Sequence, residues 1–143
     1  MWSMVQRIST VAAAVAAAAL LVTGSALASR VVKVGSASNG KSIVLFKDDR
    51  LVVSLPGNAT TGYAWRVRAL KSSVVRFVSR SYVPKQALPG KVGAGGTYIL
   101  RFRSVTPGTT TLVLVYTQAG NTKAKAASKY TLHLAVKLHP QPA

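Results

Sequence analysis

Few residues of this 143-residue chain could carry out acid–base or nucleophilic chemistry, since it holds two acidic residues, two histidines and no cysteine. Asp48 and Asp49 are neighbours between two apolar runs, so they cannot face each other across a substrate, and we interpret them as turn formers. His133 falls on the polar face of an alternating segment and His139 in the final residues, without a second ligand at zinc-binding spacing. Lys71 precedes two serines, but such a pair occurs in any basic chain. We expect no enzyme, no metal site and no cofactor.

A segment of small hydroxyl and glycine residues suggests a different chemistry, which is backbone-rich contact with a partner. Small side chains let a backbone enter a narrow slot, and a loop held at both ends loses little entropy on binding. Tyr63 and Trp65 should anchor such a loop. The alternatives are an ordinary turn with positive φ and, at residues 58–60, a glycosylation acceptor. The segment comprises Asn58, Ala59, Thr60, Thr61, Gly62 and Tyr63.

Two further connections stand out by their composition. We expect the connections at residues 56–63, 87–96 and 118–127 to emerge at one end of a sandwich and to form a contiguous rim, the candidate binding site. The second segment comprises Gly93, Ala94, Gly95 and Gly96, and a third candidate comprises Thr117, Gln118, Ala119 and Gly120.

The elements that must position these loops are strands, because apolar residues recur in steps of two and no helical period is evident. We expect residues 42–46 and 50–55 to pair as a hairpin, and the final residues from His139 to fray. The fold class is all-β, an immunoglobulin-like antiparallel β-sandwich of about seven strands. The other predicted strands are residues 65–69, 74–79, 98–103, 109–117 and 130–138.

The amino terminus has the pattern of a secretory signal peptide. Arg7 precedes an apolar run at residues 11–22, too short for the ~20 residues of a membrane span, and small residues follow. We expect cleavage after Ala28, which leaves one domain at residues 29–143 with its core at about 40–138. The protein should be exported, to the periplasm or the medium, with no membrane span after cleavage.

The formal net charge of +17 raises encounter rates with acidic partners. Weak contact with polyanions is therefore expected, without specific binding of nucleic acid, and we expect a monomer. The basic residues that would support such contact are Arg66, Arg68, Arg76, Arg101, Arg103 and the lysines within residues 123–129.

The first loop resembles the chagasin-like inhibitors of papain-type cysteine proteases. In that family the loop reads Asn-Pro-Thr-Thr-Gly-aromatic, with a tryptophan two residues later. Here Ala59 replaces the proline, and the other positions match. The family's Gly-x-Gly-Gly loop fits residues 93–96 at the right spacing, whereas its Arg-Pro-aromatic loop is absent from residues 117–120. The resemblance covers roughly residues 40–137.

The resemblance implies a reversible inhibitor whose three rim loops form a wedge in the active-site cleft of a papain-like cysteine protease. It places Thr60 near the catalytic cysteine, and residues 93–96 along the cleft. The alternative is an exported basic β-sandwich module that binds anionic envelope polymers or another protein without inhibiting a protease.

Overall fold

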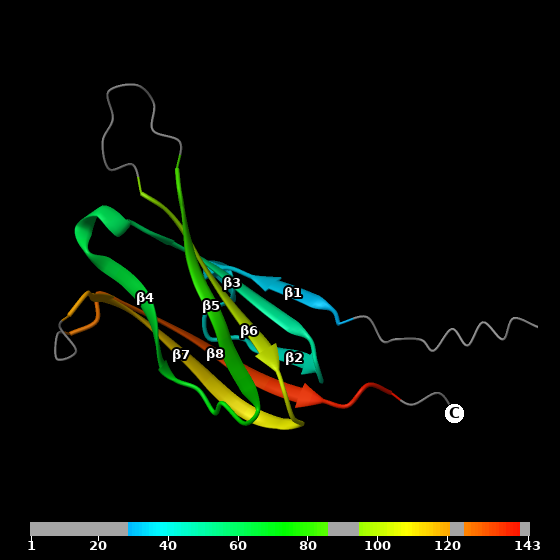
Figure 1. The fold of residues 1–143 in the computed structure, drawn as a ribbon. Helices are drawn as coiled ribbons and strands as arrows, with labels where there is room; N and C mark the ends of the chain where they lie inside the picture. The colour runs from blue at the N-terminus through cyan, green and yellow to red at the C-terminus, as the bar shows by residue number, and fades with distance from the viewer. Residues whose placement is uncertain (1–28, 86–94, 121–124, 141–143) are drawn as a thin grey trace, which may run out of the picture.

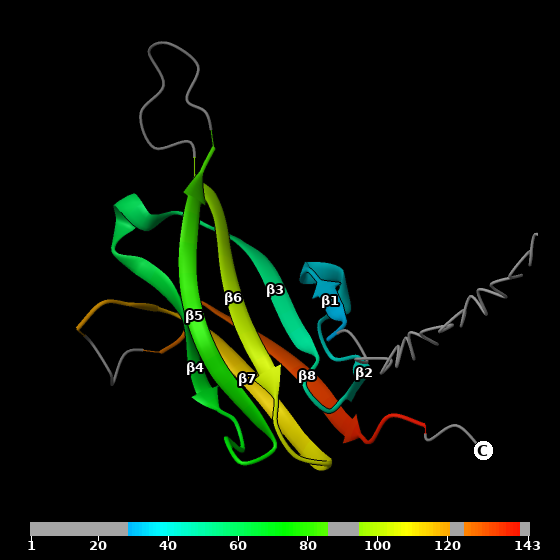
Figure 2. The same ribbon diagram turned by 45° about the vertical axis from the view of Figure 1, so that its right-hand side comes forward.

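Two four-stranded β-sheets pack face to face in the computed structural model, which describes residues 29–85, 95–120 and 125–140 (Figures 1 and 2). One sheet has the order β1-β3-β6-β5 and the other β2-β8-β7-β4. The first contains β1 (Val31–Val34), β3 (Arg50–Gly57), β6 (Gly96–Ser104) and β5 (Val75–Pro84). The second contains β2 (Ser42–Phe46), β8 (Ser128–Lys137), β7 (Gly108–Gln118) and β4 (Tyr63–Ala69), and two 3₁₀ turns are η1 (Ser36–Ser38) and η2 (Ala59–Thr61).

The core forms because alternate residues of each strand face the opposite sheet. In β3 the buried positions are Leu51, Val53 and Leu55, and β6 pairs Leu100 and Phe102 with them. The facing sheet contributes inward residues of β7 and β8 to the same cluster. Packing of this kind holds the sandwich together without a disulfide.

The predicted all-β sandwich of about seven strands is confirmed: eight strands are present within the described residues, and the additional strand is β1, which was not predicted. β1 has only four residues and pairs with β3 in parallel, and β2 pairs with β8 in parallel, so each sheet has one parallel pair at one edge and antiparallel pairs elsewhere. Strand β5 extends past residue 79 to Pro84, with a register shift between Phe77 and Ser79. The predicted signal peptide at residues 1–28 lies outside the described residues and stays a prediction. No helix in the described residues is long and apolar enough to cross a membrane.

The predicted hairpin between residues 42–46 and 50–55 is wrong, because β2 and β3 lie in different sheets. Lys47 N donates to the carbonyl of Lys137, at 2.8 Å, which continues the pairing of β2 with β8. One residue later, Asp48 N donates to Ser104 O at 3.1 Å, and this contact starts the pairing of β3 with β6. The chain therefore changes sheet within the turn, where Asp48 adopts a positive φ of 68°.

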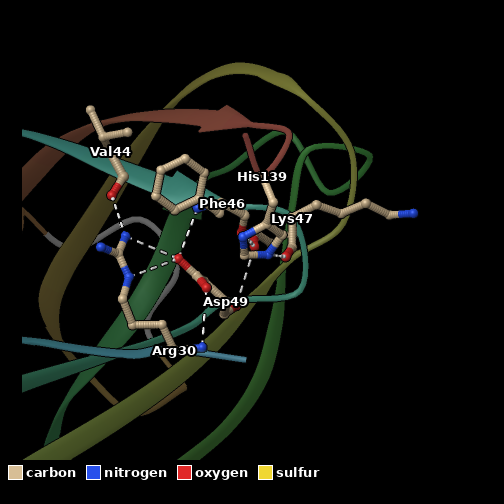
Figure 3. Close-up of polar contacts among 7 residues, drawn as sticks. Arg30, Val44, Phe46, Lys47, Asp49 and His139 are labelled. Atoms are coloured by element: carbon tan, nitrogen blue, oxygen red, sulfur yellow. Dashed lines mark hydrogen bonds and ion pairs between the residues drawn. The ribbon is translucent and has the colours of Figure 1, made fainter. Parts of the chain in front are cut away.

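The buried carboxylate of Asp49 holds this turn together, in agreement with the prediction that Asp48 and Asp49 form a turn (Figure 3). Asp49 is fully buried and accepts hydrogen bonds from the Arg30 backbone N, from the Arg30 guanidinium and from Phe46 N. The ring of Phe46 lies 5.0 Å from the guanidinium carbon and stacks on His139 at 5.2 Å. The prediction that the tail frays is therefore wrong at His139, whose Nε2 also lies 3.1 Å from Lys47 O. We call Arg30, Phe46, Asp49 and His139 the terminal clamp.

Candidate functional site

The loop between β3 and β4 is a single 3₁₀ turn closed by its own side chains. Asn58 caps it: its Oδ1 accepts from Thr60 N at 3.1 Å and from Thr60 Oγ1 at 2.6 Å. Thr61 Oγ1 donates to Asn58 O at 2.6 Å, and Gly62 ends the turn with φ 79°. Both threonine hydroxyls are thus engaged within the loop, and the exposed tip comprises Ala59, Thr60, Thr61 and Gly62.

Aromatic side chains fix this turn to the sandwich from below. Tyr116 Oη accepts a hydrogen bond from Asn58 N at 2.8 Å, and its ring lies 5.4 Å from Tyr63 and 5.2 Å from Trp65. Trp65 Nε1 donates to Pro56 O at 3.0 Å, and Tyr98 Oη donates to Tyr63 O at 2.7 Å. The predicted anchoring role of Tyr63 and Trp65 is confirmed. Because every contact reaches the loop backbone or its flanks, the tip keeps one shape before a partner arrives.

Burial and the neighbouring ring of Tyr116 raise the pKa of Tyr98 above its usual value. Desolvation disfavours the phenolate, so Tyr98 keeps its proton at neutral pH and remains a hydrogen-bond donor to the loop. The residues of the loop itself carry no ionisable group other than Tyr63. The tip is therefore electrically neutral, although the chain as a whole is strongly basic.

The glycines of the second predicted segment allow three strand ends to meet. Gly96 pairs with Gly57 on one side and with Pro84 on the other. A Cβ on Gly96 would collide with Val83 O, and a Cβ on Gly57 would lie 2.6 Å from the ring of Tyr98. Gly95 has φ 75°, and its carbonyl accepts from Lys85 N at 2.8 Å. The described end of the second segment, Gly95 and Gly96, thus lies beside the first loop, while Gly93 and Ala94 lie outside the described residues.

The third predicted segment divides into a structural and an exposed part. Thr117 is buried and pairs with Ala64, so little of its side chain is available to a partner. Gln118 ends β7 opposite Tyr63, and Ala119 N donates to Gly62 O at 2.8 Å. This segment braces the first loop through backbone contacts. Gln118, Ala119 and Gly120 are exposed beside it.

The described ends of all three connections therefore lie together, as predicted from the alternation of connections in a sandwich (Figure 1). Sequence reasoning missed Gly57, Tyr98 and Tyr116, whose contacts hold the first loop on the sandwich. A glycine preceding Asn58 and tyrosines on two predicted strands were the available signals, but their contacts join residues far apart in the sequence.

The residues considered for catalysis are dispersed. Lys71 and its two serines are exposed in the turn before β5, where Lys71 N donates to Thr110 Oγ1 at 2.9 Å. His133 is exposed on β8. Across the described ranges, no group of three or more histidine, cysteine, aspartate or glutamate residues is placed to hold a metal ion.

Comparison with known proteins identifies the family. Residues 45–134, more than half of the chain, match the model of the chagasin family peptidase inhibitor I42. Amoebiasin-1 of Entamoeba histolytica is 35% identical over 81 residues, which cover 55% of this chain and 74% of that protein.

Two solved structures have the same fold. The cysteine protease inhibitor EhICP2 from Entamoeba histolytica aligns with a TM-score of 0.68 at 16% identity, over 77% of this chain and 98% of that one. PbICP-C, solved in complex with falcipain-2, aligns with a TM-score of 0.51 at 15% identity, over 77% and 99% of the two chains. At these identities the likeness concerns the fold alone. On the family match and the relationship to amoebiasin-1, the chain belongs to the chagasin family of peptidase inhibitors and is an inhibitor, not an enzyme.

Proposed function

We propose that this protein reversibly inhibits papain-like cysteine proteases by inserting the neutral tip of residues 59–62 into the active-site cleft. Family membership supports the class of target, and it agrees with EhICP2 being a cysteine protease inhibitor and with PbICP-C forming a complex with falcipain-2. The pattern of residues 1–28 supports export to the periplasm or the medium as the setting.

The observation that carries the proposal is the pre-organised tip. Asn58 and the two threonine hydroxyls satisfy one another, and Tyr116 holds the backbone from below. A loop already fixed in one conformation loses little entropy when it enters a cleft, so more of the contact energy appears as affinity. Its small, uncharged side chains suit a slot from which water must be expelled without stranding a charge.

Each of the three rim segments would make a different contact with the protease. Thr60 would approach the catalytic cysteine with Thr61 beside it at the tip, and Ala59 and Gly62 would let the backbone follow the cleft. The segment at residues 93–96 would extend this contact along one side. Gln118, Ala119 and Gly120 would supply a weaker third contact, since they lack the cationic and aromatic side chains that often dominate interfaces.

The test is a titration of papain with residues 29–143, compared with the double variant Thr60→Asp, Thr61→Asp. We expect stoichiometric, reversible inhibition by the parent chain and a loss of roughly 100-fold in affinity for the variant, or about 2.7 kcal/mol. The reason is that a cysteine protease attacks with a thiolate, and carboxylates buried beside a thiolate are repelled and desolvated.

The control is Thr109→Asp, Thr111→Asp, which adds the same charges to exposed threonines near the start of β7. These positions lie at the opposite end of β7 from Gln118, so inhibition should stay within about twofold of the parent, allowing for the small long-range effect of charge. Equal losses in both variants would show that net charge, not the tip, governs inhibition. No inhibition by the parent chain at micromolar concentration would overturn the proposal for this protease class.

A further inference from the structure

Three arginines stand side by side across the outer face of the β1-β3-β6-β5 sheet. Arg50 of β3 is the direct partner of Arg103 of β6, which is the direct partner of Arg76 of β5. All three point away from the core, because the positions next to them, Leu51 and Phe102 among them, are buried. Adjacent strands lie about 4.8 Å apart, so the guanidinium groups start from neighbouring positions in one row.

The chain does little to neutralise this row. Arg103 reaches Asp48 at 3.5 Å, with both side chains about half exposed (49% and 52%), and such a surface pair is weak. In the part of the chain that the structure describes, Arg50 and Arg76 form no side-chain hydrogen bond and no ion pair. Like charges directly opposite one another destabilise a sheet. The row therefore has an unfavourable self-energy that an anion would relieve.

The row borders a groove of about 360 Å³ whose floor is apolar. Val31, Val52 and Val78 line it together with the arginines. A fourth arginine, Arg101, sits on the same face two residues from Arg103 and is steadied by a 3.1 Å hydrogen bond to Ser81 Oγ. The surface thus combines aliphatic valine side chains with several arginines. A guanidinium group can donate two parallel hydrogen bonds to a pair of carboxylate or sulfate-like oxygens.

We propose that this arginine groove, formed by Arg50, Arg76, Arg101 and Arg103, binds a sulfated or carboxylated polysaccharide. Sugar rings present aliphatic faces that the valine floor can contact, while their anionic substituents meet the arginines. Single-stranded nucleic acid binds by stacking its bases on exposed aromatic side chains. The one aromatic residue that lines the groove, Phe102, is buried, so a polysaccharide fits this surface better.

The groove lies at the far end of the sheet from the inhibitory tip. Arg50 is the first residue of β3 and Gly57 the last, which separates the row from the loop by roughly 20 Å of strand. A polymer seated on the row would therefore leave residues 59–62 free. Polysaccharide binding itself does not depend on the proposed function, whereas simultaneous inhibition while bound does.

The test measures the binding of fluorescently labelled dextran sulfate to residues 29–143 at several salt concentrations near 0.15 M. We expect the variant Arg50→Gln, Arg76→Gln, Arg103→Gln to lose at least tenfold in affinity and to show a shallower salt dependence. The matched control is Lys41→Gln, Lys71→Gln, Lys137→Gln, which removes three exposed charges that lie outside the groove and should lose less than threefold. A lysine version of the arginine row should fall between parent and glutamine variant, since the charge remains but the fork is lost. Thermal unfolding of each variant checks that the sandwich is intact.

Equal losses in the two glutamine variants would overturn the proposal, because they would show a diffuse field and not a site. Competition by single-stranded DNA or by acidic vesicles at the same charge concentration, as effective as polygalacturonate, would overturn the choice of polysaccharide. Titration of papain in the presence of saturating dextran sulfate gives a separate readout. Retained inhibition supports the separation of the two surfaces, and lost inhibition with retained polymer binding contradicts that separation without touching the groove.

Discussion

At one end of the sandwich the chain passes between the sheets through residues 58–63 without a charged side chain, whereas at the other end it turns through residues 47–49 around a buried carboxylate. The tip is held by an asparagine cap, threonine hydroxyls and the Tyr116 hydroxyl. The terminal clamp is held by an ion pair, a cation–π contact and a stacked histidine.

The difference follows from what each end must do. A surface that enters a cleft gives up its water, and a neutral, internally satisfied loop loses less in that step than a charged one. The clamp faces no such demand, and both ends of the described chain meet there (Figures 1 and 2). The two acidic residues of the sequence both lie at this end, which leaves the tip uncharged and the arginine row largely unneutralised.

The largest expected effect tests the clamp alone. Asp49→Asn places an amide donor against the Arg30 and Phe46 donors, and it should lower the free energy of unfolding by about 3 kcal/mol. Asp48→Asn is the matched control, since it removes an exposed charge, and asparagine also tolerates the positive φ at this position. It should cost under about 1 kcal/mol. Urea unfolding of both variants measures the contrast, and protease inhibition should be unchanged in each folded variant.

An effect of intermediate size separates the stability of the sandwich from the order of the tip. Tyr116→Phe leaves Asn58 N without its 2.8 Å acceptor and should cost about 1 kcal/mol of stability. It should also weaken protease inhibition roughly fivefold, because the tip loses its support. Tyr130→Phe removes the 2.8 Å bond from a buried hydroxyl to Gly35 O and should cost a similar stability. Equal inhibition by the two variants would contradict a pre-organising role for Tyr116.

The smallest expected effect restores the proline that the family has at the tip. Ala59 is the first residue of η2, a position that proline favours, and Asn58 before it is extended with φ −134° and ψ 103°, as a residue preceding proline requires. Ala59→Pro should therefore stabilise the fold by about 0.4–1 kcal/mol and tighten inhibition about twofold. Measurement of both quantities on one preparation checks it. A loss of stability would show that the present tip differs from the proline-bearing form.

Sequence patterning determined seven of the eight described strands and the composition of the tip, because both depend on neighbouring residues. The two-residue alternation in residues 130–137 identifies the core face of β8, and the run from Asn58 to Gly62 contains the cap, the hydroxyls and the left-handed terminus that close a turn. Motif matches in the first loop and at residues 93–96 indicated the family.

Tertiary structure alone decided which strands pair and what supports the tip. Residues 42–46 and 50–57 are adjacent in the sequence, yet the turn at Asp48 and Asp49 sends them to different sheets, because its hydrogen bonds go to β8 and β6. Support of Asn58 by Tyr116 and alignment of Arg50, Arg103 and Arg76 join residues that no local pattern connects. Alternation determines the face on which a side chain lies, while long-range pairing determines its neighbours.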